Sequence, residues 1–325
     1  MHLYFRDPGG FMAEYMNTPN DLTPAASTAL DPALTAAKIT NLPRGIVPRT
    51  CTRLVAFVDV GAHLLWYMVV AWDERFGGSI ISYGAFPEQA RPYFAGSDPR
   101  PGLADLSEFR GKAQSAAIYG ALSAIAGLVL GAAYRQEDTG SEMRVERCLV
   151  DANWGPGTDL VYEFCRRSPY AQVLLPSHGK FIGASSNSMA TWQVRPGERA
   201  GLGWRISPAS SARGRHVTFD TNHFKTFAAD RVRTPAGAAG CLQLFDAGLI
   251  GHRLIADHFA SEYPVGVTGR GRIVPEWKNL PGRDNHWWDC LTGAGMVGRY
   301  GREWRHTASF GAATEDQAQR ALRPT

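Results

Sequence analysis

The clearest pattern along the chain is a series of short apolar runs separated by glycine-containing turns. Three such runs lie close together, at 51–60 (CTRLVAFVDV), 63–72 (HLLWYMVVAW) and 78–86 (GSIISYGAF). Apolar runs of this length joined by tight turns are typical of neighbouring antiparallel strands. The pattern therefore predicts a three-stranded antiparallel meander that begins at about residue 51.

Helix-like and strand-like segments alternate along the rest of the chain, except that 177–214 is rich in Gly and Ser and predicts an irregular segment. The elements expected are a helix at about 105–135, a strand at 146–152, a helix at 159–167, strands at 172–176 and 215–220, a helix at about 221–233, a strand at 240–245, a helix at about 250–262, a β-rich stretch at 266–278 and a closing helix at about 284–299. Strands that follow helices are typical of parallel crossovers. The sequence thus predicts an α/β fold: a central mixed sheet, with three antiparallel strands and then parallel strands, flanked by helices.

The same pattern predicts the boundaries of the folded domain. Residues 1–50 are rich in Pro, Thr and Ala and predict an N-terminal arm or linker, with one short helix at 11–17. The domain is expected over 51–305, and the polar stretch 306–325 predicts a flexible tail. The uncharged stretch from 113 to 133 is mostly Ala and Gly, so we interpret it as a buried crossover helix rather than a membrane span.

Composition narrows the class of protein. With 325 residues, of which 44% are hydrophobic, the chain can bury a full core, and disorder throughout is excluded. The formal charge of +4 is too small to indicate nucleic-acid binding by itself. Five scattered Cys without a C-x-x-C pair argue against a disulfide framework or a structural zinc site and favour a reducing compartment. The chain contains no P-loop motif, so a P-loop nucleotide site is not expected.

Two aspartates end predicted strands. Asp59 follows the first apolar run, and Asp151 follows the strand at 146–152. If these strands are parallel neighbours, both carboxylates emerge at the same sheet edge, where they repel one another unless a cation lies between them. Carboxylate oxygens suit Mg²⁺ or Mn²⁺. The alternative is that each aspartate only caps the turn after its strand.

A third acid lies in the predicted closing helix. Asp289 follows Trp287 and Trp288 and precedes an apolar pair, so an unpartnered carboxylate there would be costly. Three such carboxylates can hold two divalent ions about 4 Å apart. Nearby, His286 could be an outer metal ligand, a proton shuttle or a hydrogen-bonded surface residue. Asp284 could be an auxiliary of the site, but it is better explained as a helix N-cap.

The order of elements and the placing of these acids resemble the ribonuclease H-like fold. The local strings resemble the nuclease domain of phage terminase large subunits, which package and cut viral DNA. This resemblance rests on LVAFVDVGAHLLWYMVVAW with ISYGAFP, CLVDANWGPGTDLVYEFCR, DTNHFKTF and DNHWWDCL, and it covers roughly residues 50–300. FMAEYMNTP is similar to the segment just before that domain. Unlike such large subunits, the chain has no Walker A loop, which puts autonomous packaging in doubt.

The resemblance implies a metal-dependent endonuclease that cleaves double-stranded DNA and cuts viral concatemers during packaging. Asp59, Asp151 and Asp289 fall at the family's three acidic positions and would hold two Mg²⁺ or Mn²⁺ ions. The implied partners are double-stranded DNA, a separate ATPase domain, a terminase small subunit and a capsid portal, in the host cytoplasm. Two alternatives remain open: a junction-resolving nuclease of the same fold, and a catalytically silent DNA-binding or portal-docking module.

A basic segment is the candidate DNA-binding surface. Between 195 and 233 there are eight Lys and Arg residues against three acids, and such a segment can follow a phosphate backbone without reading bases. The alternative is a solvated loop and helix face. Lys225 is expected to touch a phosphate or the active-site carboxylates. The other DNA-binding candidates are Arg195, Arg199, Arg213, Arg215, Lys180, Arg270 and Arg272, the last two at the tip of a predicted hairpin.

Overall fold

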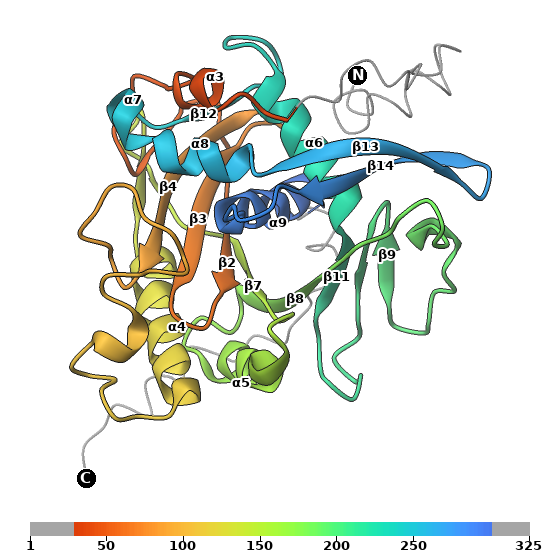
Figure 1. Cartoon of the computed structure of the whole chain (residues 1–325), viewed down its shortest axis with the longest axis horizontal. Helices are drawn as coiled ribbons and strands as arrows, with labels where there is room; N and C mark the ends of the chain where they lie inside the picture. Colours follow the sequence, from red (N-terminus) through yellow and green to blue (C-terminus); the bar gives the residue numbers. More distant parts are fainter. Residues whose placement is uncertain (1–28, 301–325) are drawn as a thin grey trace.

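A nine-stranded mixed sheet forms the centre of the computed structural model, which describes residues 29–300 (Figure 1). The strand order is β12 (Leu242–Leu244), β4 (Gly78–Phe86), β3 (Leu65–Trp72), β2 (Arg53–Val60), β7 (Arg147–Asp151), β8 (Leu174–Lys180), β11 (Val217–Asp220), β10 (Trp204–Ile206) and β9 (Arg199–Gly201). Strands β2, β3 and β4 form an antiparallel meander, whereas β2, β7, β8 and β11 are parallel. The predicted α/β fold with a mixed sheet is therefore confirmed.

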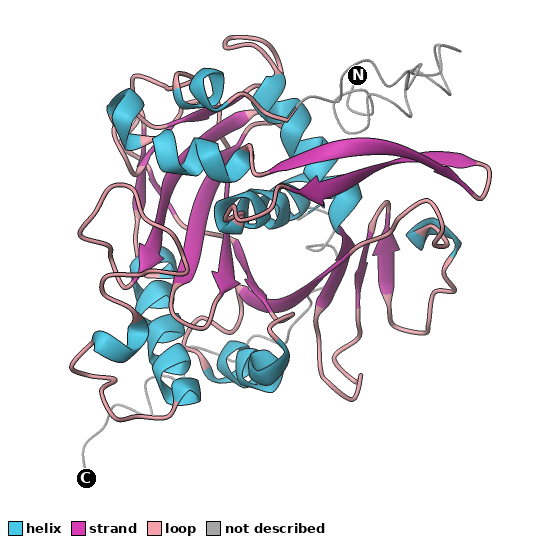
Figure 2. Cartoon of the chain, in the orientation of Figure 1, coloured by secondary structure: helices cyan, strands magenta, loops and turns pink. Residues whose placement is uncertain are grey.

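Helices cover both faces of this sheet (Figure 2). On one face, α4 (Gln114–Leu130) and α5 (Thr158–Arg167) share a core with every second residue of the central strands, including Val58 and Val150. On the other face, α6 (Thr221–Arg233), α8 (Arg253–Phe259) and α9 (His286–Tyr300) share a core with Phe57 and Leu149. Because side chains alternate along a strand, successive residues of β2 and β7 point alternately into the two cores.

Several smaller elements lie beside this framework. Strands β13 (Glu262–Gly269) and β14 (Arg272–Asn279) form a hairpin that projects beyond the sheet as an arm (Figure 1). Strands β1 (Ile46–Val47), β5 (Tyr134–Gln136) and β6 (Glu142–Met143) form a small separate sheet. The short helices are α3 (Pro32–Ala36), α7 (Gly248–Gly251) and the 3-10 turns η1 (Leu103–Asp105), η2 (Gly155–Gly157) and η3 (Met189–Thr191).

Several predicted boundaries differ from those observed. The helix expected from about 105 begins only at Gln114, after a turn in which Gly111 has a φ of 74°. The segment expected to be irregular, 177–214, contains the end of β8 and the β9–β10 hairpin, whose turn uses Gly203 at φ 75°. The helix expected at 250–262 is interrupted at His252, and its last predicted residue already belongs to β13.

The stretch predicted as an arm also contains structure. Residues 29–50 include α3 and β1, and Leu30 and Val47 are buried against the domain. The helix predicted at 11–17 and the tail predicted at 306–325 lie outside the described residues. Within the described part of the chain, no helix combines the length and apolarity that crossing a membrane requires.

Close packing of α9 on β2 depends on a glycine. A Cβ at Gly293 would overlap the ring of Phe57, so only a residue without a side chain lets the helix approach the sheet this closely. Asp289 lies one turn earlier, at the i−4 position, and therefore on the same side of α9. The packing of the helix thus sets how near Asp289 lies to the sheet.

We predict that Gly293→Ala lowers the free energy of unfolding by about 1–3 kcal/mol, the usual cost of overpacking a core. Gly127→Ala is the matched control, because Gly127 is also helical but has no atom within 4 Å of the added methyl group. That variant should gain up to about 1 kcal/mol from reduced backbone entropy of the unfolded chain. Urea denaturation measures both; equal effects of the two substitutions would contradict the packing argument.

Candidate active site

Asp59 and Asp151 lie at the carboxyl ends of neighbouring parallel strands. The pairing of β2 with β7 places Val58 opposite Val150, so the next residues along, Asp59 and Asp151, are level with one another. Both aspartates point to the side opposite to these valines, which is the side that α9 covers. The structure therefore brings these two predicted site residues to one edge of the sheet.

Asp289 completes the acidic cluster from the first turn of α9, a helix that packs on both β2 and β7. The pKa of Asp151 is raised to about 8, mainly by burial and in addition by the charges of Asp59 and Asp289. The pKa of Asp289 is raised to about 6 by desolvation, against the opposing charge of Lys225 and with Asp59 contributing, although 36% of its side chain remains accessible. The three carboxylates therefore act on one another as a single electrostatic site.

His286 holds one of these acids. Its Nδ1 lies 2.7 Å from Oδ2 of Asp59, and its ring stacks on Trp66 at a centroid distance of 4.8 Å. Burial by itself would lower the pKa of His286, but the hydrogen bond and charge of Asp59, with Asp284 and Asp289, outweigh it and raise the pKa. His286 is thus a partner of the site, and the aromatic stack fixes the plane of its ring.

Asp284 acts on a loop instead of capping the helix. Its Oδ2 accepts a hydrogen bond of 2.6 Å from the backbone N–H of Gly96, and α9 begins two residues later. A Cβ at Gly96 would lie 3.2 Å from Nε2 of His286. Asp284 therefore ties the loop at 95–98 against His286, so the N-cap interpretation is wrong.

Lys225 lies beneath Asp289 in a buried network. Its Nζ is 3.0 Å from Oδ1 of Asp289 and 2.6 Å from Oε1 of Glu262, a fully buried carboxylate. Asn285 donates to both acids, at 3.0 Å to Oδ2 of Asp289 and 2.8 Å to Oε1 of Glu262. Of the two expectations for Lys225, contact with the carboxylates is the one observed.

The donor set at this edge fits a hard divalent cation, although the described residues contain no group of three or more His, Cys, Asp or Glu side chains already arranged around one. Asp59, Asp151 and Asp289 offer oxygen ligands, which Mg²⁺ and Mn²⁺ prefer. Each carboxylate oxygen has two lone pairs, so the hydrogen bonds to His286 and Lys225 leave positions for a metal. Burial is the main cause of the raised pKa of Asp151, and a cation would relieve the repulsion from Asp59 and Asp289 that adds to it.

The predicted DNA-binding residues divide into two groups. Arg270 and Arg272 do lie at the hairpin tip, but they donate to backbone oxygens of the 183–186 loop and to Asn187, so they hold this loop rather than facing solvent freely. Arg195 and Lys180 are exposed, and Nζ of Lys180 lies 4.8 Å from the ring of Trp192 at the carboxyl end of β8. Arg213 is exposed as well, whereas Arg199 and Arg215 are partly buried. Burial lowers the pKa of Arg215, and the nearby charge of Arg199 lowers it further.

Other arginines of the basic segment are structural. Arg205 is buried and forms an ion pair of 3.0 Å with Glu198, and Arg231 is buried with its guanidinium over Phe227. The net excess of basic residues between 195 and 233 therefore overstates the charge that DNA would meet. Lys180 is the candidate nearest to the acids along the sheet, since β8 is the neighbour of β7.

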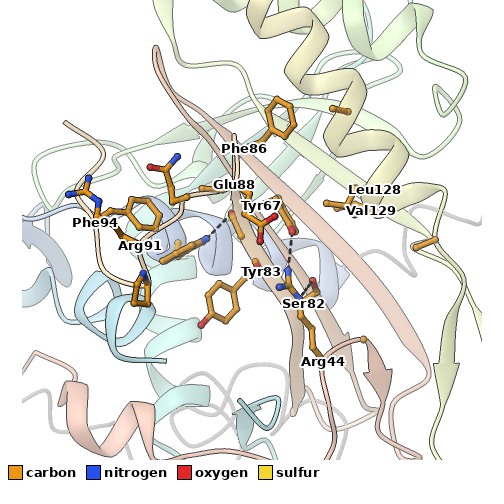
Figure 3. Close-up of a pocket in the computed structure, with 18 of the residues that line it drawn as sticks. Arg44, Tyr67, Ser82, Tyr83, Phe86, Glu88, Arg91, Phe94, Leu128 and Val129 are labelled. Carbon is orange, nitrogen blue, oxygen red and sulfur yellow. Dashed lines mark hydrogen bonds between the residues drawn. The ribbon is translucent and has the colours of Figure 1, made fainter. Parts of the chain in front are cut away.

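The structure also contains a cavity of about 730 Å³ (Figure 3). It is lined by Arg44, Tyr67, Phe86 and Leu128 among others, and Trp287 of α9 forms part of its wall. None of the three aspartates lines it. The cavity is therefore separate from the acidic site, although Trp287 and Phe94 of its wall both pack on Trp66, the residue that stacks on His286.

Three residues of the site escaped sequence reasoning: Glu262, Asn285 and Trp66. Glu262 follows a helix and begins a strand, and no local pattern indicates that its partner is 37 residues away. Asn285 was visible in the DNHWWD string, but only the folded chain shows that it bridges two acids. Trp66 lies opposite Asp59 in the β2–β3 pair, a register that correct strand boundaries would have indicated.

The sheet order, the flanking helices and the acids at strand ends are those of a ribonuclease H-like nuclease domain. Over residues 23–299 the chain matches the sequence model of the terminase large subunit gpA endonuclease domain, and it belongs to that family. No curated protein and no solved structure matches the chain. The suspected kinship with phage terminase nuclease domains is therefore confirmed.

Burial of Asp151 and its repulsion by neighbouring acids predict a pH-dependent stability in EDTA. Asp151 titrates near 3.8 when unfolded and at about 8 when folded, so the folded chain holds this proton more tightly. Stability from this group is therefore present at acidic pH and lost as the pH rises through 8. Asp151→Asn, which cannot ionise, should raise Tm near pH 8.5 by at least roughly 2–4 °C, the shift that 1 kcal/mol causes in a large domain. Thermal melts should show this gain vanishing near pH 4; a gain independent of pH would contradict it.

Proposed function

We propose that the chain is a metal-dependent endonuclease that cleaves double-stranded DNA, cutting viral concatemers during genome packaging. Membership of the terminase endonuclease family supports a nuclease role in packaging. The observation that supports the chemistry is the partly buried cluster of carboxylates from β2, β7 and α9, in which burial and the charges of neighbouring acids raise the pKa of Asp151 and of Asp289. A protein keeps such a cluster at a cost unless a cation or a substrate phosphate makes use of it.

Each residue has a distinct part in this proposal. Asp59, Asp151 and Asp289 would hold two Mg²⁺ or Mn²⁺ ions, which when bound supply Lewis-acid activation of water and neutralise charge at the phosphate. His286 fixes the rotamer of Asp59 through its Nδ1 and through stacking on Trp66. Lys225 supplies a fixed positive charge behind Asp289. Asp284 keeps the loop at 95–98 closed over His286.

The biological setting follows from the family and is part of the proposal. We infer that the substrate is double-stranded viral DNA in the host cytoplasm. A separate ATPase domain, a terminase small subunit and a capsid portal would supply movement, site choice and docking. The sequence contains no P-loop motif, so the proposal assigns ATP hydrolysis to a separate domain.

The first test is removal of the middle carboxylate. Asp151→Ala should reduce cleavage of linear duplex DNA at least about 100-fold, because several kcal/mol of charge stabilisation depend on the bound ions. EDTA should abolish wild-type cleavage, and Mn²⁺ or Mg²⁺ should restore it. The variant should remain folded by circular dichroism, since a repelling charge has been removed.

Wild-type rates in Asp151→Ala would refute the assignment of the site. A panel of linear, supercoiled and four-way DNA separates the alternatives. Preference for four-way DNA would indicate a junction-resolving nuclease. DNA binding without cleavage in Mn²⁺ would indicate a silent DNA-binding or portal-docking module.

Salt dependence tests the DNA-binding surface. Phosphate contacts make affinity fall with salt, and each contact contributes about 0.9 to the slope of log affinity against log salt. Lys180→Ala should therefore reduce this slope by about 0.9, as measured by fluorescence anisotropy. Arg144→Ala is the matched control, because Arg144 is exposed near the opposite end of β7 and donates to Gly131. A slope unchanged by the Lys180 substitution, or lowered equally by the control, would place the DNA elsewhere.

A further inference from the structure

Glu262 closes a ring of hydrogen bonds around Asp289 without touching it. Lys225 and Asn285 each bridge the two acids, through Oε1 of Glu262 and through one oxygen each of Asp289. The four contacts measure 2.6 to 3.0 Å and join α6, β13, the segment before α9 and α9 itself. One oxygen of Glu262 thus fixes both of the donors that orient the Asp289 carboxylate.

Burying the charged groups of this ring costs desolvation free energy. Glu262 has no exposed surface, and its Oε2 has no hydrogen-bond partner among the described residues. A buried ion pair contributes little net stability, and apolar residues of the same volume are often as good or better. Stability alone therefore does not explain why a second carboxylate lies beside Lys225.

The distribution of charge offers an explanation. Lys225 carries one positive charge and lies 0.4 Å closer to Glu262 than to Asp289, at 2.6 Å against 3.0 Å. If Glu262 were neutral, Lys225 and Asp289 would form a closed pair with no net charge. When the negative charge of Glu262 offsets the positive charge of Lys225, the group of three keeps one net negative charge, that of Asp289.

We propose that Glu262 is a positioning residue that offsets the charge of Lys225 and so leaves Asp289 able to bind a divalent cation. This inference rests on the proposed function, since it assumes that Asp289 is a metal ligand. Glu262 acts through Lys225 and Asn285, at one remove from the metal. Substitution of such outer residues typically weakens metal affinity by about 10- to 100-fold.

Titration of the metal-free protein with Mn²⁺ by calorimetry tests the proposal without relying on activity. Glu262→Gln keeps the volume and the Oε1 acceptor of the ring but removes the charge. It should weaken Mn²⁺ binding about tenfold or more. The double variant Glu262→Gln with Lys225→Met removes both charges, so Asp289 should regain Mn²⁺ affinity to within a few-fold of the wild type.

Controls separate this role from a structural one. Glu163→Gln breaks an exposed ion pair with Arg167 on α5 and should leave Mn²⁺ affinity unchanged. Thermal melts report folding of every variant. Wild-type affinity in Glu262→Gln overturns the proposal, and so does a folded double variant that binds as weakly as the single one, because geometry rather than charge would then matter. A wild-type chain that binds no Mn²⁺ would instead contradict the proposed function itself.

Discussion

Repulsion among three partly buried carboxylates is the constraint on which the site depends. Asp59, Asp151 and Asp289 come from three elements, and burial together with their mutual charges raises the pKa of Asp151 to about 8. Three polar neighbours contact these carboxylates. His286 binds Asp59, while Lys225 and Asn285 bind Asp289. The arrangement leaves an excess of negative charge at one sheet edge, which is the property that a cation-dependent phosphodiesterase requires.

The fold supplies this arrangement through two kinds of packing. Parallel pairing of β2 with β7 makes the first two aspartates level, whereas a slip of one residue in either strand would turn its aspartate to the face away from α9. The approach of α9 to Phe57, which Gly293 permits, brings the third aspartate to the same place. The aromatic stack of Trp66 on His286 then fixes the outer edge of the site. The geometry of the site therefore depends on the packing of the core, and a change in the distance between α9 and the sheet would disturb both.

The sequence predicted what depends on local pattern. The strands that end in Asp59 and Asp151 carry their own apolar signal, and the cost of an unpartnered acid beside Trp287 and Trp288 drew attention to Asp289. What it could not predict depends on contacts between distant segments. Glu262 meets Lys225 across 37 residues, and Arg272 at the hairpin tip bonds to carbonyl oxygens 86 and 89 residues earlier. The sequence shows that a side chain is basic, but it does not show which backbone oxygens accept its hydrogen bonds.

A crystal structure of the protein soaked in Mn²⁺, with anomalous diffraction data, tests the central claim most directly. The account predicts anomalous peaks at the carboxyl ends of β2 and β7, with oxygens of Asp59, Asp151 and Asp289 at coordination distances of about 2.1 Å. Peaks bound by other residues, or an Asp289 side chain that stays turned away from the ion, would contradict it.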